Sequence, residues 1–380
     1  MDFQFSEIHE MIRETARKFA QERVAPGTIE RDEREEFPKA IVGELAELGF
    51  MGMMVPEEWG GAGLDTLSYA LAVEEISKVD ASVGVIMSVN NSLVCFGLNK
   101  EGSQFQKERF LRDLASGRKL GAFALSEPEA GSDASNQRTT AARDGDSYIL
   151  NGVKNWITNG STADIVLVMA ATDKAKGAKG ISTFIVEKGT PGFTVGKKER
   201  KLGIRSSDTV SLSLTDCRVP AANRIGEEGG GFKFAMKTLE GGRIGIAAQA
   251  LGIAQACLDA STRYAKERKA FDHPIAELQA IQFKIADMAT SVEAARMLVY
   301  RAAFMKDSGS SFGQEAAMAK LFASKIAVQA ALEAIQIHGG YGYVREYLVE
   351  RYLRDAKITE IYEGTSEIQR IVIARGLLRG

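Results

Sequence analysis

The spacing of apolar residues changes twice along the 380-residue chain, and this change limits the possible folds more than any other feature. Up to about Leu114, apolar residues recur every three or four positions, the period of an amphipathic helix. From about Lys119 to about Val219 the chain instead contains short β-type runs separated by turn signals. Helical spacing returns after GEEGGGF at 226–232. The sequence therefore predicts a helical, a β and a second helical segment, in that order.

A chain of this length is too long for one ordinary hydrophobic core, so we expect a multi-domain α+β protein. The predicted units are an N-terminal α-helical domain at 1–118, a central β-barrel or sandwich domain at 119–228, and a C-terminal helical bundle domain at 229–380. The charged run at 31–36 is expected to be a solvated segment. One bundle helix has the three-and-four spacing of a packed seam, formed by Leu278, Ile281, Ile285, Met288, Val292, Ala295, Val299 and Ala302.

Charge is nearly balanced, with 48 Lys and Arg against 50 Asp and Glu, so nothing indicates a nucleic-acid or anionic-membrane partner. The three cysteines and three histidines are too scattered for a metal site or a disulfide framework, which favours a reducing compartment. We identify no uninterrupted apolar run long enough to cross a bilayer and no signal peptide. The expected location is the cytoplasm or, for a mature eukaryotic form, the mitochondrial matrix.

The phosphate-binding loops of common nucleotide enzymes are missing. GGAGLD at 60–65 and GEEGGG at 226–231 do not match the dinucleotide fingerprint, and neither lies in a βαβ context. A Walker loop and a G-x-S-x-G elbow are also missing. A nicotinamide enzyme on a Rossmann domain is therefore disfavoured, and any nucleotide cofactor binds by another route.

Two stretches of the β segment could contact a ligand. ALSEPEAGSD at 124–133 gathers hydroxyls and a glycine in one loop, where hydroxyls and backbone N–H groups can face a ligand. The alternative for this loop is a polar β-turn. Trp156, in NWITNG at 155–160, could stack on a planar ligand, whereas the alternative is a tryptophan that fills the core of the β domain.

Two stretches of the second helical segment are also candidates. ERKAF at 267–271 ends a helix, and its arginine could bind a pyrophosphate; the alternative is a solvated last turn whose cations complement the helix dipole. In QIHGGYGY at 336–343, two adjacent glycines can end a helix and let a ligand approach the backbone closely. His338 alone indicates no function.

Glu363 lies in ITEIYEGTSEIQR at 358–370, between an aromatic residue and a glycine, directly before a helix-start signal. Ser366 and Gln369 have the spacing of a capping box, so the glutamate is expected on the turn that leads into a helix. A single loop glutamate is usually solvated, and local sequence makes Glu363 only a candidate for proton transfer.

In this order, these stretches resemble the acyl-CoA dehydrogenase family, and most closely its short-chain (butyryl-CoA) members. The likeness spans nearly the whole chain and includes LSEPEAGSD, WITNG, KLGIRSSDT, DCRVP, GRIGIAAQALGIAQ, ERKAF, LQAIQFKIADM, EAAMAKLFAS, QIHGGYGY and RDAKITEIYEGTSEIQR. The resemblance implies a C-terminal four-helix bundle after the helical and β domains, bound FAD, and a homotetramer built as a dimer of dimers. It further implies oxidation of an acyl-CoA to a trans-2-enoyl-CoA in fatty acid β-oxidation, with electrons passing to electron-transfer flavoprotein.

By this resemblance Glu363 is the catalytic base that removes the α-proton, while flavin N5 accepts the β-hydride. A carboxylate in an apolar pocket is expected to have a raised pKa. The implied FAD contacts near the catalytic turn are Phe123, Leu125, Ser126, Ser132, Trp156, Thr158, Thr365 and Glu367. Those that would reach the FAD of a neighbouring subunit are Arg268, Phe271, Gln279, Gln336 and Gly340. The implied substrate contacts are Ser132, Glu240, Arg243 and Gly364, of which Glu240 and Arg243 would meet the CoA nucleotide.

Two positions differ from other branches of the family. In the isovaleryl and long-chain branches the base stands immediately before the arginine of the earlier helix, and here that position is Gly242. Glutaryl-specific members use an arginine for the distal carboxylate, and Gly84 aligns with it. A dicarboxylyl substrate is therefore disfavoured.

Two other functions remain open from the sequence. An acyl-CoA oxidase would pass electrons to oxygen, although typical oxidases of this superfamily have extra C-terminal sequence. A non-catalytic acyl-CoA-binding scaffold could keep the fold, although Glu363 is retained. Overall similarity favours a C4 acyl chain first, with C6 to C8 or short branched groups as alternatives.

Overall fold

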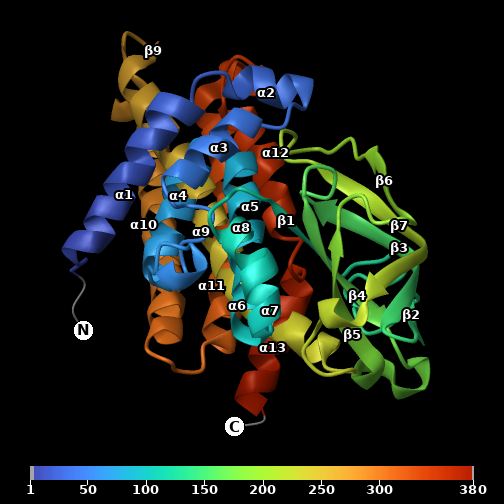
Figure 1. Cartoon of the computed structure of the whole chain (residues 1–380). Helices are drawn as coiled ribbons and strands as arrows, with labels where there is room; N and C mark the ends of the chain where they lie inside the picture. The colour runs from blue at the N-terminus through green and yellow to red at the C-terminus, as the bar shows by residue number, and fades with distance from the viewer. Residues whose placement is uncertain (1–3, 379–380) are drawn as a thin grey trace.

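The computed structural model describes residues 4–378, in which two sets of helices pack together and a β-rich unit, central in the chain order, lies at one side of them (Figure 1). This arrangement confirms the predicted α+β fold with a central sheet. Short π-helical turns at Ala20–Val24, Val89–Cys95 and Lys107–Leu111 join several helices of the first set. The helices of that set are α1 Glu7–Phe19, α2 Thr28–Arg34, α3 Lys39–Glu47, α4 Thr66–Ser77, α5 Ala81–Ser88, α6 Phe96–Glu101, α7 Gln104–Gln106 and α8 Arg112–Ala115.

The β unit is one sheet with the strand order β6-β7-β3-β2-β4-β5-β8, and β1 pairs in parallel with β4. Alternating side chains of its strands form a core separate from that of the helices, centred on Tyr148, Leu150 and Phe184. The strands are β1 Gly121–Ala124, β2 Thr140–Asp144, β3 Ser147–Thr158, β4 Ile165–Ala171, β5 Ile181–Glu187, β6 Phe193–Lys198, β7 Thr209–Pro220 and β8 Arg224–Ile225.

The second helical set packs around α9, which has buried residues along most of its length. Its helices are α9 Gly231–Glu267, α10 Gln279–Asp307, α11 Gly313–His338, α12 Val349–Thr359 and α13 Ser366–Leu378. A small hairpin of β9 Lys269–Ala270 and β10 His273–Pro274 connects α9 to α10. The predicted seam of α10 is buried at Met288, Val292, Ala295, Val299 and Ala302. Its first three positions are only partly covered, and Leu278 is 38% exposed.

Two helical stretches are long and apolar enough on average to span a membrane, although polar residues interrupt both of them. They are 81–101 and α9. Their most apolar windows are 94% and 83% buried inside the protein, as in core helices of a soluble protein.

The prediction of a solvated segment at 31–36 is confirmed only in part, because Glu33, Arg34 and Glu36 are exposed whereas Asp32 is buried. Most of the run lies in α2. The two terminal nitrogens of Arg354, on α12, donate to the two carboxylate oxygens of Asp32 at 3.2 and 2.7 Å. Arg205, from the loop between β6 and β7, lies 3.8 Å from the same carboxylate. Asp32 therefore connects the first helical set, the β unit and α12.

Arg354→Met should destabilise the protein, because it leaves Asp32 buried without its main cationic partner. We expect the free energy of unfolding, measured by chemical denaturation, to fall by about 3 kcal/mol. Lys176→Met is the control, since it breaks a solvent-exposed ion pair with Asp173 and should leave the free energy of unfolding nearly unchanged. Equal losses in the two variants would contradict a special role for the Asp32 pair.

Candidate active site

Glu363 stands on the tight turn between α12 and α13, where the sequence places it. Its φ is +53°, in the left-handed region that costs a residue with a side chain about 1 kcal/mol or more. Gly364 follows with φ +93°, which glycine adopts without that cost. The side-chain amide of Gln369 donates to the backbone carbonyls of Glu363 and Gly364 at 3.3 and 2.8 Å. The turn is therefore held from the helix that follows it.

The predicted capping box of Ser366 and Gln369 is wrong. Helix α13 begins at Ser366 itself, and the hydroxyl of Thr365 accepts a hydrogen bond from the backbone N–H of Ile368 at 3.4 Å. Thr365 is therefore the capping residue. The Gln369 side chain donates through Nε2 to the carbonyls of the turn, and its Oε1, the atom that a capping box would use as acceptor, has no hydrogen-bond partner among the described residues.

The Glu363 carboxylate is the most unusual group on this turn. Its Oε2 atom is shielded from solvent and has no hydrogen-bond partner among the described residues, although the residue as a whole is half-buried. A Cβ added to Gly242 of α9 would lie 2.2 Å from that oxygen and 2.8 Å from Leu93 Cδ2. The carboxylate thus occupies the space over the bare Cα of Gly242. A buried acceptor without a donor indicates a place where a ligand or a proton completes the site.

Burial raises the pKa of Glu363 to about 7, even though the positive charges of Lys320 and Arg243 act to lower it. Removing a carboxylate from water disfavours its charged form, and the two cations offset only part of that effect. A base whose pKa is near neutral pH has a useful affinity for a proton while still being substantially ionised.

Arg243 lies on the same face of α9 as Glu240, as predicted, but the two differ in depth. Arg243 is buried, and burial lowers its pKa although Glu240 and Glu363 act to raise it. Its Nε has no hydrogen-bond partner among the described residues. Glu240 is half-buried beside Gly313, where an added Cβ would lie 3.2 Å from its carboxyl carbon. The arginine is therefore close to the carboxylate of the turn.

Gly84, aligned with the arginine of glutaryl-specific members, is buried in α5. A Cβ at this position would lie 2.1 Å from the hydroxyl oxygen of Ser77 on α4. A side chain at position 84 would therefore require the Ser77 hydroxyl to move, and it would still pack tightly against the Ser77 Cβ at 3.2 Å.

The predicted ligand contacts of the β unit lie in and beside β1 and β3. Phe123 and Leu125 are buried, whereas Ser126 and Thr158 are half-buried and Ser132 is exposed. Trp156 is 62% exposed, so the alternative of a tryptophan that fills the β core is excluded.

Trp156 also has φ +62° and lies where the pairing of β3 with β7 shifts register. A bulge of this kind re-aims a side chain away from the regular pleat. The strained, exposed indole is therefore available to contact a planar ligand.

A buried ion pair shapes the loop that begins with Leu125. The ammonium of Lys154, fully buried on β3, donates to Glu127 Oε1 at 2.7 Å and to the Leu125 carbonyl at 3.2 Å. The Glu127 carboxylate in turn accepts backbone N–H bonds from Arg138 and Thr139 at 2.6 and 3.1 Å. The loop is thus organised around one buried ammonium group, and it is not the simple polar β-turn of the alternative interpretation. Sequence reasoning missed Lys154, although a lysine at an inward position of an apolar strand is a usable signal.

A second group of predicted residues lies at the far end of the helical bundle. Arg268 ends α9 and Gly340 follows α11, and both line a pocket of about 510 Å³ that also includes Tyr341. The Arg268 guanidinium lies over the Tyr341 ring, 5.4 Å from its centroid. The remaining members are exposed: Phe271, Gln279 and Gln336.

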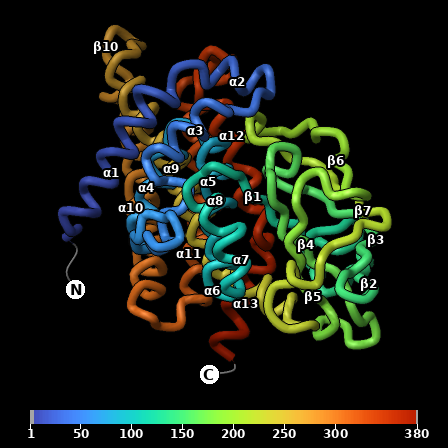
Figure 2. The backbone as a smooth tube through the Cα atoms, in the orientation of Figure 1, coloured from blue at the N-terminus to red at the C-terminus, as the bar shows by residue number. Residues whose placement is uncertain are grey.

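The two groups of predicted cofactor residues lie far apart within one chain. The hairpin that follows Arg268 is at one side of the molecule, and the β unit with Trp156 is at the other (Figure 2). Within one chain the two groups therefore do not form one compact site.

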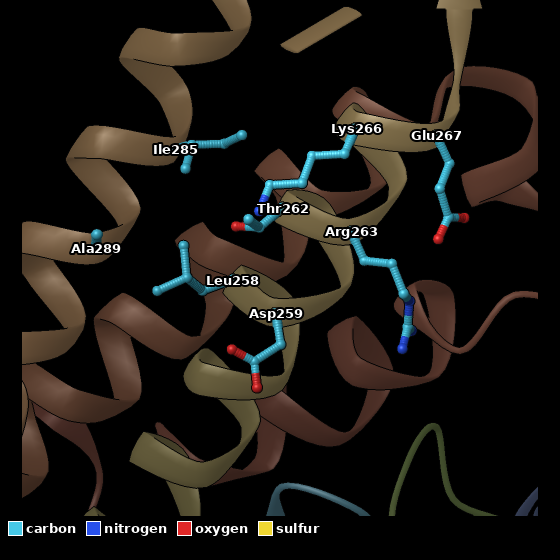
Figure 3. A pocket seen from close by; sticks show the side chains of 8 residues that line it. All are labelled: Leu258, Asp259, Thr262, Arg263, Lys266, Glu267, Ile285 and Ala289. Carbon is cyan, nitrogen blue, oxygen red and sulfur yellow. The ribbon is translucent and has the colours of Figure 1, made fainter. Parts of the chain in front are cut away.

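A further pocket of about 590 Å³ lies between α9 and α10 (Figure 3). It contains none of the predicted cofactor or substrate residues. Arg263 and Lys266 line it together with Asp259 and Glu267, so its charges are of both signs. Asp259 already pairs with Lys78. The pocket has no evident relation to the Glu363 turn.

A half-buried glutamate with one shielded, unpartnered carboxylate oxygen, on a turn that packs against a helical bundle, is the arrangement of an enzyme whose reaction moves a proton. Family models of the three acyl-CoA dehydrogenase domains match the chain in order, the N-terminal domain at 6–118, the middle domain at 122–217 and the C-terminal domain at 229–378. The chain belongs to the acyl-CoA dehydrogenase family, whose members are FAD-dependent oxidoreductases.

Several relatives are similar over their full length. The mitochondrial short-chain specific acyl-CoA dehydrogenase of Mus musculus is 55% identical over 373 residues, which cover 98% of this chain and 90% of the relative. The structure of butyryl-CoA dehydrogenase from Megasphaera elsdenii is 51% identical with a TM-score of 0.98, and covers all of both chains. A chain from a structural study of the electron transferring flavoprotein of Acidaminococcus fermentans and flavin-based electron bifurcation is 52% identical with a TM-score of 0.99, again over all of both chains.

Lys154→Met should destabilise the β unit, because Glu127 would keep its charge in a buried position without a cation. We expect a loss of about 3–5 kcal/mol in the free energy of unfolding, measured by chemical denaturation. The matched control is the double variant Lys154→Met/Glu127→Gln, which removes both charges and should recover part of the loss. A double variant as unstable as the single one would show that charge imbalance is not the cause.

Proposed function

We propose that the chain converts a short-chain acyl-CoA to its trans-2-enoyl-CoA, with Glu363 as the base that removes the α-proton. The observation that carries this proposal is the Glu363 Oε2 atom, which is buried without a partner on a carboxylate whose pKa is near 7. When bound, FAD supplies the acceptor for the hydride that leaves the β-carbon. The proton is transferred to the glutamate, so the two hydrogens leave the substrate by separate routes.

The turn also supports a role in activating the thioester. An α-C–H next to a thioester is still a weak acid at neutral pH, so its removal needs a stabilised enolate oxygen as well as a base. In this proposal the backbone N–H of Glu363 donates to the thioester carbonyl, and Gly364 lets the substrate approach the backbone. The left-handed geometry of the turn, held by Gln369, fixes both groups in one orientation.

The residues around the β unit fit a flavin. In this proposal Trp156 and Thr158 contact the ring system, since the indole is exposed and the bulge of β3 directs it outward. Thr365 and Glu367 lie at the start of α13, where the positive end of the helix dipole favours an anionic group such as a phosphate. The other proposed contacts of this group are Phe123, Leu125, Ser126 and Ser132.

The residues at the bundle end fit the cofactor of a neighbouring subunit. A Cβ added to Gly340 would meet nothing within 4 Å, so its backbone is open to a ligand. Arg268 beside it offers a guanidinium that can pair with phosphate oxygens. Phe271, Gln279 and Gln336 complete the proposed set. Because these residues lie far from the β unit of their own chain, we propose a homotetramer arranged as a dimer of dimers.

Ser132, Glu240 and Arg243 are the proposed contacts of the acyl-CoA. Arg243 lies close enough to Glu363 to affect its pKa, so we assign it to the acyl half of the substrate rather than to the nucleotide. Glu240 is nearer the surface and is assigned to the CoA moiety. A C4 acyl chain is the proposed first choice, supported by the butyryl-CoA dehydrogenase of Megasphaera elsdenii and the short-chain specific relative of Mus musculus.

Electron-transfer flavoprotein is the proposed electron acceptor. A structural study of such a flavoprotein, from Acidaminococcus fermentans, includes a chain with a TM-score of 0.99 to this one. The similarity to full-length bacterial dehydrogenases, among them one from Bacillus subtilis, supports a cytoplasmic location.

Anaerobic titration of the purified protein with acyl-CoAs of increasing length tests the reaction and the substrate range together. We expect butyryl-CoA to bleach the flavin absorbance most efficiently. Glu363→Gln should bind FAD but slow the bleaching by about 10²–10⁴-fold, because it removes the general base. A Glu363→Gln protein as active as the parent would exclude the assigned base. Rapid reoxidation of the flavin in air, with release of hydrogen peroxide, would identify an oxidase. Binding of acyl-CoA without bleaching of the flavin would identify a scaffold.

The rate of flavin reduction should depend on pH through Glu363. Only the carboxylate form can accept a proton, so the rate should rise with pH through about 7 and then reach a plateau. Stopped-flow reduction with butyryl-CoA at saturating concentration measures this profile. A rate already maximal well below pH 7 would contradict a raised pKa.

A further inference from the structure

A lysine of α11 hydrogen-bonds to the backbone of the turn that carries Glu363. Lys320 is fully buried, with 0% of its surface exposed. Its ammonium donates to the backbone carbonyl of Thr359 at 2.9 Å and to that of Gly364 at 2.8 Å. Thr359 is the last residue of α12, and Gly364 directly follows Glu363. One side chain therefore links the two ends of the segment that carries the carboxylate.

The surroundings of Lys320 are unfavourable for a charged side chain. Its neighbours along the buried face of α11 are small and apolar, among them Ala316, Ala317 and Ala323. Burial lowers the pKa of Lys320 to about 8, although the charge of Glu363 acts to raise it. A buried ammonium is tolerated when its donors are used and negative potential is nearby. Here the potential comes from the carbonyl end of α12 and from Glu363.

We propose that Lys320 is the positioning residue of this site: its ammonium ties the Thr359 and Gly364 carbonyls together and so fixes the turn on which Glu363 stands. This inference rests on the proposed function, because it assigns Lys320 to the same proton transfer. Lys320 does not hydrogen-bond to the carboxylate, so the proton-accepting oxygen stays free. The lysine acts through the shape of the turn and through its positive charge.

Several other titratable groups lie near Lys320 and the Glu363 carboxylate. The other groups that influence the Glu363 carboxylate or Lys320 are Arg243 from α9, Glu360 from the turn, Tyr69 from α4 and Tyr362 beside the carboxylate. Burial raises the pKa of both tyrosines, so they are neutral around pH 7. Arg243 and Lys320 are then the two cations that favour the ionised base. Removal of either should leave the carboxylate harder to ionise.

The chain offers a variant that separates the two effects of Lys320. Gln369 also donates to the Gly364 carbonyl, at 2.8 Å, but it is uncharged. Gln369→Met therefore loosens the turn and keeps the positive charge of Lys320, whereas Lys320→Met loosens the turn and removes that charge. Lys325→Met is the matched control, because Lys325 is an exposed lysine of the same helix.

The test is stopped-flow reduction of the FAD-loaded enzyme by butyryl-CoA, followed from acidic to alkaline pH, with FAD content recorded for each protein. In Lys320→Met we expect the plateau rate to fall about tenfold. We also expect the rising limb of the pH profile, the range in which the rate increases with pH, to move by about one pH unit toward higher pH. In Gln369→Met the plateau should fall while the limb stays in place. Lys325→Met should match the parent in both.

The outcomes separate this inference from the proposed function. If the parent protein is not bleached by any acyl-CoA, the proposed function fails. If the parent is bleached and Lys320→Met has the parent's plateau and limb, only the role of Lys320 is overturned. A Lys320→Met protein that fails to retain FAD is replaced by Lys320→Gln, which keeps a donor without the charge and should still show the shifted limb. Loss of FAD in both variants, or an unshifted limb in Lys320→Gln, would make Lys320 a residue of folding and overturn the proposal.

Discussion

The close approach of the Glu363 carboxylate to the bare Cα of Gly242 determines how the site is built. An oxygen can occupy that space only because α9 has no side chain there, and Leu93 closes the same space from the first helical set. Packing of this kind excludes water, which is why the carboxylate has a pKa near 7 and lacks a donor. The turn, the long α9 helix and the N-terminal helices must therefore be held in a fixed relation for the base to have its properties.

Buried charges maintain that relation at several points. Asp32 connects α2 to α12 through Arg354, just before the turn, and to the β unit through Arg205. Inside the β unit, Lys154 and Glu127 close the loop that begins at Leu125. Each of these ionic contacts joins chain segments that are distant in sequence. Removing one partner of a buried ion pair lowers stability by more than the intact pair adds to it. The protein thus uses charge to fix geometry at the places where its cofactor is proposed to bind.

The sequence predicts features that depend on local pattern. The strands β3 to β5 and the buried seam of α10 from Met288 onward follow from apolar periodicity, and the glycine after Glu363 marks the turn. Features that depend on distant partners were missed. Lys320 looks like any other lysine in the sequence, Lys154 is marked only by its inward position on an apolar strand, and Asp32 lies in a charged run typical of a solvated surface. The capping box failed because Thr365 and Ser366 are both able to cap, and α13 begins at Ser366, one residue earlier than a Ser366 cap requires.

The shared space of Glu363 and Gly242 has a consequence for how such a protein can change through evolution. A side chain gained at position 242 collides with the carboxylate, whereas loss of the carboxylate alone leaves the site without a base. In other branches of the family the base stands on the earlier helix, at this same position, so the two positions offer alternative origins for one carboxylate. A lineage that moves the base from one to the other must pass through a protein with a crowded or an empty site, or change both residues together. The two positions are therefore coupled by sterics, and their substitutions are expected to depend on each other although they lie 121 positions apart in the sequence.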